Sequence, residues 1–317
     1  MIEYLMLILL TGATGNLGQN ALPELLRQGH HVRCFVRHPG AFEKNARHLA
    51  GTIELVEGDI RQPADLAKAV QDVEAIIHLA YMIPPASEDH PELARSINVD
   101  GTRNLLEAAC SQPVLPRILF SSSFDVFGHT QDQPPPRKVT DPVQATDHYT
   151  THKIACEEMV RTSGLQWTIF RFADITPLGL RAPHPIMFHI PLATRFEVIH
   201  PYDAGLAIAN GICSNEVWSK ILLIGGGPGC QILYRDYLGR MLEMMGVGML
   251  PERAFGSEPY STDWLDTGES QRLLHYQRYT FDDIMQQLTR IVGYKRKLTA
   301  LVRPLARWWI LRMSPFL

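Results

Sequence analysis

The sequence predicts an α/β protein in which a doubly wound parallel sheet is followed by a smaller C-terminal lobe. Over the first 125 residues, strand-like and helix-like patterns alternate, and this order indicates β-α-β units on a parallel sheet. The strands are continuous apolar runs, as expected where helices cover both faces of a sheet. Beyond residue 171 the pattern loosens, because prolines at positions 177, 183, 185, 191 and 201 exclude long regular elements.

The elements of the first half begin and end on local signals. The first apolar run stops at a glycine-rich turn, and the helix after it stops at Gly29, a common residue just beyond a helix. We expect strands at Leu5–Leu10, His31–Val36, Thr52–Glu57, Ala75–Leu79 and Arg117–Ser121, and helices at Asn20–Gln28, Ala64–Val70 and Glu92–Ala109.

The second half follows a proline-rich loop at residues 128–148. We expect helices at Tyr149–Ser163, Asp203–Ile212, Tyr234–Met245 and Phe281–Ile291, and strands at Gln166–Phe170 and Ile221–Ile224. The predicted domains are a sheet domain at residues 1–171, an interleaved lobe at 172–291 and a basic amphipathic tail at 292–317.

Composition excludes several classes of protein. With 45% hydrophobic and 20% charged residues, the 317-residue chain is neither disordered nor a coiled coil. Its net charge of −3 argues against nucleic-acid binding. Five scattered cysteines favour a reduced, cytoplasmic setting, and thirteen histidines without metal-ligand spacing indicate no metal site. The apolar start is too short to span a bilayer, and we interpret it as a buried strand.

The turn after the first strand has the composition of a phosphate-binding loop. It reads Gly12-Ala13-Thr14-Gly15-Asn16-Leu17-Gly18 and lies between an apolar strand and a helix. Glycines there let the backbone approach a pyrophosphate at the helix N-terminus. The motif predicts a dinucleotide site that includes Gly12, Thr14, Gly15, Asn16, Leu17 and Gly18. The alternative is a tight structural turn.

Basic residues follow the second strand, where an NAD enzyme usually places an acid for the ribose hydroxyls. The chain has Val36-Arg37-His38 there, with Lys44 seven residues after Arg37. A guanidinium matches a 2′-phosphate in geometry and charge, so the pair favours NADP(H), with NAD(H) still possible. The alternative is two solvated surface charges.

Three further residues form a candidate catalytic set. Tyr149 and Lys153 are four residues apart, so on a helix they share one side. An ammonium near a phenol stabilises the phenolate and lowers the phenol pKa. Ser123 follows the strand before this helix, at the end where parallel-sheet enzymes place their chemistry. A serine there is also a common turn residue.

In this order, the three signals resemble the extended branch of the short-chain dehydrogenase/reductase superfamily, over residues 5–290. Gly58-Asp59-Ile60 is similar to its adenine-contacting turn, His78-Leu79-Ala80 to its fourth strand, and Asn98–Thr102 to the start of its long-helix signature. The resemblance implies a Rossmann-type fold and cofactor contacts from Asp59, Ile60, Leu79, Ala80, Asn98, Tyr149 and Lys153.

The same resemblance implies a mechanism and an assembly. Tyr149 would exchange a proton with the substrate oxygen, Lys153 would bind the nicotinamide ribose, and Ser123 would orient the carbonyl of a small-molecule substrate. Helices near residues 92–109 and 149–163 would pair in a homodimer.

Two departures from the family pattern bear on the substrate. Asp174 stands where epimerases have an asparagine facing a diphosphate, and its charge would repel that group. Phe124 interrupts the acidic pair of the dehydratases and leaves only Asp125. These departures favour an NADP(H)-dependent oxidoreductase on a small or apolar substrate. The alternatives are a sugar-nucleotide epimerase or dehydratase with bound NAD, and a dinucleotide-sensing protein without turnover.

The tail combines apolar spacing with basic charge. Residues 284–317 contain seven Lys or Arg and no acid, and Pro304 should kink or split the predicted helix. An interfacial helix on anionic lipid needs this combination, so the tail is a candidate for peripheral membrane contact. The alternative is that Trp308, Trp309 and Leu311 pack on the protein's own C-terminal lobe or across the dimer.

Overall fold

A seven-stranded parallel sheet forms the centre of the molecule, as the alternating pattern predicts. The computed structural model describes residues 5–40, 42, 53–179 and 182–317. The strand order is β3-β2-β1-β4-β5-β6-β9. The strands are β1 (Leu7–Thr11), β2 (His31–Val36), β3 (Ile53–Glu57), β4 (Ala75–His78), β5 (Arg117–Ser123), β6 (Trp167–Phe172) and β9 (Lys220–Ile224).

The chain changes direction across this sheet between β1 and β4. Leu10 of β1 pairs with Cys34 of β2 on one side and with Ile77 of β4 on the other. From β1 the order runs outward to β3 on one side and to β9 on the other. Such a switch point opens a crevice at the carboxyl ends of the strands, where ligands of α/β proteins bind.

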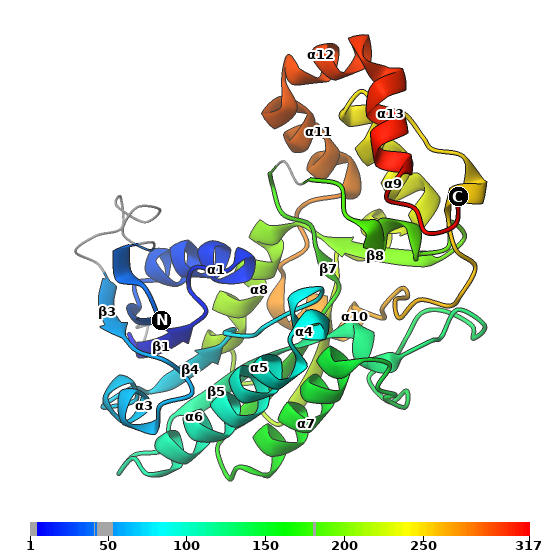
Figure 1. Ribbon diagram of the computed structural model, residues 1–317. Coiled ribbons are helices and arrows are strands. Elements are labelled where there is room, and N and C mark those ends of the chain that lie inside the picture. The colour runs from blue at the N-terminus through cyan, green and yellow to red at the C-terminus, as the bar shows by residue number, and fades with distance from the viewer. Residues whose placement is uncertain (1–4, 41, 43–52, 180–181) are drawn as a thin grey trace.

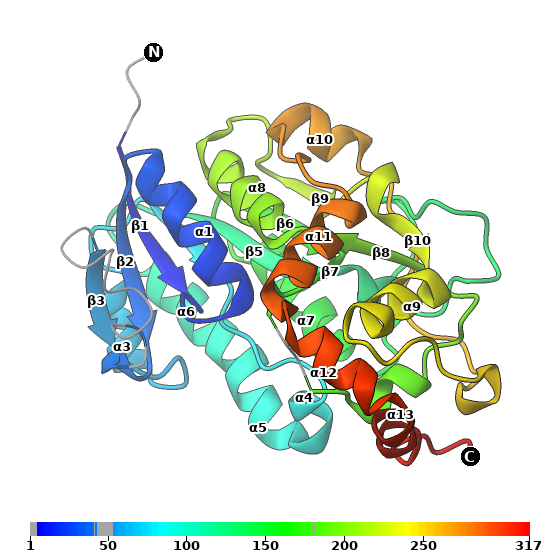
Figure 2. The ribbon, with the colours of Figure 1, turned by 90° about the horizontal axis from the view of Figure 1, so that it is seen from above.

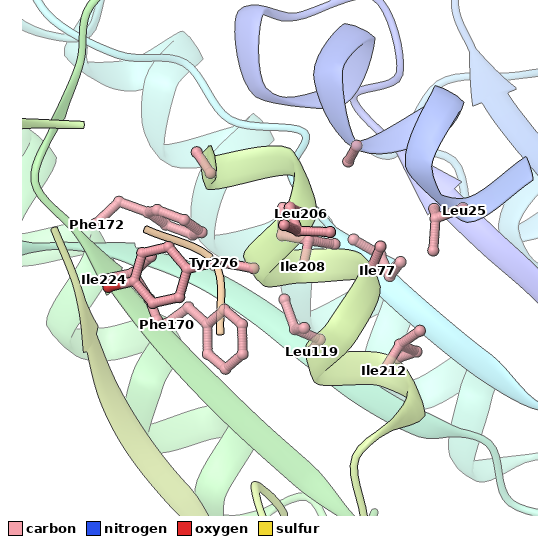
Figure 3. Packing of buried hydrophobic residues seen from close by; sticks show 14 of the residues in the cluster. Leu25, Ile77, Leu119, Phe170, Phe172, Leu206, Ile208, Ile212, Ile224 and Tyr276 are labelled. Carbon is pink, nitrogen blue, oxygen red and sulfur yellow. The ribbon is translucent and has the colours of Figure 1, made fainter. Parts of the chain in front are cut away.

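Helices cover both faces of the sheet (Figures 1 and 2). One face carries α1 (Asn16–Arg27) and α8 (Pro201–Cys213), whose Leu206, Ile208 and Ile212 pack toward the strands (Figure 3). Close to them lies α10 (Gly268–Leu274). The other face carries α3 (Pro63–Ala69), α6 (Gly101–Cys110) and α7 (His148–Thr162).

The long helix expected at residues 92–109 is interrupted. It consists of α5 (Pro91–Arg95), a π-helical segment η2 (Ser96–Asp100) and α6. Asn98 and Val99 of that segment are buried. Such π-helical segments often lie at functional sites, and this one borders the loop after β4.

The smaller lobe has its own sheet and its own core. Strands β7 (Asp174–Ile175), β8 (Arg195–Ile199) and β10 (Gln231–Leu233) form a three-stranded sheet in the order β10-β8-β7. A separate apolar cluster joins this sheet to α9 (Tyr234–Met244) and α11 (Phe281–Val292). The tail continues as α12 (Lys295–Leu301) and α13 (Arg303–Leu311), so the predicted split near Pro304 is present. Short turns complete the lobe: η4 (Pro185–Phe188), η5 (Pro228–Cys230) and η6 (Glu252–Ala254).

The proline-rich loop ties the two parts together through a buried carboxylate. Asp263, which is 2% exposed, pairs with Arg195 of β8 and with Arg137 of the loop, at 2.6 Å and 3.3 Å. It also accepts a hydrogen bond from Thr130 of the same loop. Because an unpaired buried charge is costly, these contacts are expected to hold the loop against the lobe. No helix among the described residues is long and apolar enough to cross a membrane.

Candidate active site

The glycine-rich turn between β1 and α1 is shaped by close backbone contacts. Gly12 has φ +74°, and a Cβ there would lie 2.7 Å from the Ala80 amide nitrogen. A Cβ at Gly18 would lie 2.2 Å from the Gly12 carbonyl oxygen. Gly15 is the N-cap of α1 and supplies no side-chain cap, and Thr14, Gly15 and Asn16 are exposed. The turn therefore fits a pyrophosphate, whose charge would meet the first amides of the helix.

A buried hydrogen-bond chain holds the end of β4 against this turn. The Thr11 hydroxyl oxygen accepts hydrogen bonds from the Leu79 and Ala80 amides at 3.2 Å and 3.1 Å. It also lies 2.8 Å from His78 Nδ1, and His78 Nε2 lies 3.0 Å from the Thr102 hydroxyl. Burial, reinforced by the charge of Lys153, lowers the pKa of His78 to about 3. The imidazole is therefore neutral and serves to position Leu79 and Ala80 beside Gly12.

Asn98 binds the backbone of the loop that follows β4. Its amide oxygen accepts from the Met82 N–H at 2.7 Å, and its amide nitrogen donates to the Met82 carbonyl at 2.9 Å. The residue is fully buried. Its side chain is thus engaged with the backbone of the loop after β4 and fixes the path of that loop.

The residues expected around the adenosine lie at the ends of β2 and β3. Arg37 is exposed directly after β2. Asp59 follows β3 and pairs with Arg61 at 2.5 Å, and this hydrogen bond holds the pKa of Asp59 below its ordinary value. Ile60 is buried against Gly101. Lys44, the other basic residue predicted to meet a 2′-phosphate, lies outside the described residues.

Ser123, Tyr149 and Lys153 come together where β5 ends and α7 begins. Ser123 is the last residue of β5, and Tyr149 and Lys153 lie one turn apart near the start of α7. The Lys153 ammonium donates to the Ser121 carbonyl at 2.6 Å and lies 5.7 Å from the centre of the Tyr149 ring. All three side chains are more than 90% buried. The predicted set is therefore one cluster at the carboxyl edge of the sheet.

Burial dominates the protonation of this cluster. It raises the pKa of Tyr149 well above its ordinary value; the charge of Asp125 adds to this, and a hydrogen bond with Ser123 opposes it. Burial lowers the pKa of Lys153 to about 7. It raises the pKa of Asp125, whose carboxylate accepts from the Ser123 hydroxyl at 2.9 Å, to about 7. Tyr149 is therefore a phenol at neutral pH, which is the form that donates a proton.

Comparison with known proteins places the segment that contains this site in a known family. The model of the NAD dependent epimerase/dehydratase family matches residues 8–182, more than half of the chain. The matched segment contains the glycine turn, Ser123, Tyr149 and Lys153.

The chain belongs to the NAD dependent epimerase/dehydratase family. Its relatives include the 3-beta-hydroxysteroid dehydrogenase of Mycolicibacterium neoaurum, 32% identical over 130 residues, or 39% of this chain and 34% of that protein. The sterol demethylase protein B of Methylococcus capsulatus is 36% identical over 124 residues, or 39% of this chain and 36% of that protein. The aligned segments thus span about a third of each relative's length.

Solved structures share the fold over nearly the whole chain. The UDP-glucuronic acid 4-epimerase of Bacillus cereus, in complex with UDP-glucuronic acid and NAD, superposes with a TM-score of 0.74 and 17% identity. That superposition covers 92% of this chain and all of the epimerase chain. The likeness extends over the smaller lobe, of which the family model covers only the beginning.

Two residues of the site have no signal in the sequence. Tyr81 presents its ring face to the Lys153 ammonium, 3.5 Å from the ring centre, and stands edge-on to the Tyr149 ring. The Glu88 carboxylate accepts the backbone N–H groups of His148 and Tyr149, each at 3.1 Å. Only the local cap of α7, in which Asp147 accepts from the Thr150 N–H, could have been predicted from its spacing. Tyr81 and Glu88 reach the helix through tertiary contacts, after β4 and on α4 (Ala86–Asp89).

Carboxylates gather on the side of the site that faces the smaller lobe. The charges of Asp147 and Asp174 both raise the pKa of Asp125, after burial. The same three carboxylates, after burial, raise the pKa of Tyr260, a half-buried residue of the smaller lobe. Acidic side chains from the sheet domain and the smaller lobe therefore lie near one another, with the Tyr260 phenol among them.

Proposed function

We propose that this chain is an NADP(H)-dependent oxidoreductase that interconverts a carbonyl and an alcohol on a small or apolar substrate. The observation that carries the proposal is the cluster of Ser123, Tyr149 and Lys153 beside a glycine turn that fits a dinucleotide. A phenol that can donate its proton, a second hydroxyl donor and a lysine at one strand end are groups that carbonyl reduction can use.

Each side chain has a distinct task in this scheme. Tyr149 donates its phenolic proton to the substrate oxygen, and Lys153 holds the nicotinamide ribose and stabilises the phenolate that results. Ser123 donates a hydrogen bond to the same substrate oxygen and orients it. When bound, the nicotinamide supplies or accepts the hydride at the carbon that bears this oxygen. Oxidation of an alcohol runs through the same steps in reverse.

The preference for NADP(H) over NAD(H) rests on Arg37. Its guanidinium is exposed just beyond β2, and the neighbouring Asp59 is paired with Arg61. Arg37 is therefore the charged group best placed for a 2′-phosphate, while the ribose hydroxyls lack the acid that NAD enzymes place after the second strand.

The substrate class follows from charge. A nucleotide diphosphate would bring two negative charges toward Asp125, Asp147 and Asp174, and like charges repel most strongly where water is excluded. A neutral, apolar alcohol or ketone meets no such penalty. Two relatives named for steroid and sterol chemistry agree with this choice, although each is matched over about a third of its length.

The main alternative is a sugar-nucleotide epimerase with resident NAD. It is favoured by the superposition with the Bacillus cereus epimerase over 92% of the chain. A dinucleotide sensor without turnover is a weaker alternative, because such a protein needs none of Ser123, Tyr149 and Lys153.

A cofactor-coupled screen tests these proposals. NADPH absorbance is followed over aldehydes, ketones, ketosteroids and nucleotide sugars, and purified protein is denatured to release any bound nucleotide. We expect NADPH consumption with an apolar carbonyl compound and no tightly held nucleotide. Tightly bound NAD together with interconversion of nucleotide sugars would show the epimerase instead. No turnover with any class, combined with nucleotide binding, would favour the sensor.

We also propose a cytoplasmic homodimer. The five cysteines form no disulfide, as suits a reducing compartment. Exposed surfaces of α6 and α7 are available for a two-fold interface, and two-fold dimers are the commonest oligomers. Light scattering at micromolar concentration should give twice the 35.8 kDa chain mass. A mass of one chain would refute the dimer.

A further inference from the structure

The last two helices leave a row of large apolar side chains uncovered. α12 and α13 form the end of the smaller lobe farthest from α3 and α6 (Figure 1). α12 has no buried residue, and α13 buries only Ile310. The exposed apolar residues are spaced three or four apart, and we call their surface the tail face. Each keeps more than half of its surface exposed: Leu298, Leu301, Val302, Leu305, Trp308 and Trp309.

The tail face is exposed although the tail is firmly attached to the lobe. The Arg307 guanidinium donates to the carbonyl oxygens of Val247, Gly248 and Met249 at 3.2, 3.1 and 2.6 Å. Ile310 is 2% exposed and belongs to the apolar core of the lobe. The inner side of the tail thus packs on the protein, as one of the two sequence interpretations expects for Leu311. The tryptophans, in contrast, remain half exposed, at 54% and 52%.

Charge distinguishes the tail face from an ordinary apolar patch. Residues 284–317 contain seven basic residues and no Asp or Glu. Arg296 and Arg303 pair with Glu243 of α9. Lys295, Lys297 and Arg312 are exposed, and Arg312 lies over the Trp308 ring at 4.9 Å. Exposed apolar groups are therefore bordered by Lys295, Lys297 and Arg312, and the tail itself contributes no Asp or Glu side chain.

We propose that the tail face docks on the surface of an anionic lipid bilayer. Tryptophan rings suit the boundary between headgroups and acyl chains, and lysines beside them would meet anionic headgroups. A second copy of the chain is a poorer occupant, because it would bring a second positive face against the first. The contact is peripheral, since each helix is far shorter than a membrane span.

This docking is independent of hydride transfer, because neither tail helix contributes to the site described above. If the proposed function also holds, docking would bring the site close to apolar substrates dissolved in the lipid. Vesicle binding is measured without cofactor or substrate, so the two proposals fail separately.

Co-sedimentation with vesicles tests the docking. The natural protein is mixed with vesicles of phosphatidylcholine alone, or of phosphatidylcholine and phosphatidylserine, at low and high salt. We expect binding to the mixed vesicles that weakens at high salt, and little binding to phosphatidylcholine alone. The double variant Lys295→Gln/Lys297→Gln should bind about thirtyfold more weakly. Trp308→Ser/Trp309→Ser should bind roughly tenfold to a hundredfold more weakly.

Matched variants elsewhere on the surface serve as controls. Lys68→Gln/Lys138→Gln removes the same charge, and Val114→Ser/Leu115→Ser removes two exposed apolar side chains outside the tail. Both should bind vesicles as the natural protein does. Failure of the natural protein to sediment with mixed vesicles at low salt would overturn the proposal, as would equal losses in the control variants. A mass in light scattering that falls only in the tryptophan variant, without vesicles, would show that a second copy covers the face.

Discussion

The side of the site formed by the seven-stranded sheet and the side formed by the smaller lobe differ in how tightly they are constrained. On the sheet side, the glycine turn leaves no room for a Cβ at Gly18, and Ser123 ends a strand of seven residues. On the lobe side, Asp174 lies in a strand of two residues and Tyr260 in a segment without regular structure. The family model reaches residue 182, so it covers the first side and only the beginning of the second.

This difference assigns reaction and substrate to different parts of the chain. A turn that excludes a Cβ, and a strand end fixed by hydrogen bonds to neighbouring strands, tolerate little change in sequence. They therefore suit the cofactor and the proton donor, which take part in the reaction whatever the substrate is. Short strands and irregular segments can be rebuilt without loss of the core. On this account the sheet side sets the chemistry and the lobe side selects what is reduced. The following predictions challenge that division, from the largest expected effect to the smallest.

The largest effect is expected from Tyr149→Phe. The variant keeps the ring and its contact with Tyr81 but loses the proton donor. Turnover should fall by about 10²–10⁴-fold, the usual worth of general acid–base catalysis, while NADPH affinity stays unchanged. Initial rates and fluorescence titration measure the two quantities. Tyr202→Phe, at an exposed tyrosine near the start of α8, should leave both unchanged. Normal turnover in Tyr149→Phe would remove this residue from the mechanism.

Arg37→Ala tests the cofactor preference of the sheet side. Loss of a charge-assisted phosphate contact costs about 1.5–3 kcal/mol, so NADPH should bind roughly tenfold to a hundredfold more weakly. NADH affinity should not change, because NADH lacks the 2′-phosphate. Arg161→Ala, at an exposed arginine near the end of α7, is the matched control. Equal affinity of the natural protein for the two cofactors would contradict the preference.

Asp125→Asn probes the boundary between the two sides through the pH dependence of stability. Burial raises the pKa of Asp125 from 3.8 to about 7, so between these pH values the folded state binds the proton more tightly than the unfolded state. The stability that this proton contributes is lost as the pH rises to 7. The asparagine variant has no such loss. Its free energy of unfolding, relative to the natural protein, should therefore increase by about 4 kcal/mol between pH 4 and pH 8.

Denaturant titrations at the two pH values measure this difference. Asp236→Asn, on α9 and away from the site, should show no comparable change. A constant offset between Asp125→Asn and the natural protein would mean that the Asp125 carboxyl ionises normally. Asp147 and Asp174 would then not raise the pKa of Asp125 as inferred above.

The smallest effect is expected from Glu88→Gln. Glu88 caps the first two residues of α7 from a neighbouring helix, and loss of its charge should lower stability by about 1 kcal/mol. Because the cap fixes the start of the catalytic helix, kcat should fall more than KM rises. Glu92→Gln, at an exposed acid of α5, is the control. A stability loss with unchanged kcat would show that Glu88 supports the fold without positioning Tyr149.

The fold of the sheet domain could be predicted because its signals are local. Apolar runs such as Ala75–His78 and stop signals such as Gly29 depend on a few neighbouring residues. The three-stranded sheet of the lobe was not predicted, because β7 and β10 have two and three residues and pair with β8 over long separations. The break in the long helix was missed for a similar reason, since it depends on the packing of Asn98 against Met82.

The site shows the same division. The positions of Ser123, Tyr149 and Lys153 relative to the predicted strand and helix can be read from the sequence. The structure brings the three residues together. Tyr81 and Glu88 meet α7 only through tertiary contacts, so neither has a sequence signature. The gathering of Asp147 and Asp174 around Asp125 likewise joins residues from separate elements. The residues proposed to contact a substrate are therefore the part of the site that is hardest to predict from the sequence.

Transfer of deuterium from labelled cofactor tests the central claim most directly. Protein is incubated with NADPH deuterated at the transferable C4 position and with the substrate found in the screen, and the product is analysed by mass spectrometry. The account predicts one deuterium on the product carbon that carries the new hydroxyl, with one equivalent of NADP⁺ released. A product isomerised without deuterium, and with no net change in NADPH absorbance, would show that the hydride returns to its source, and would contradict the account.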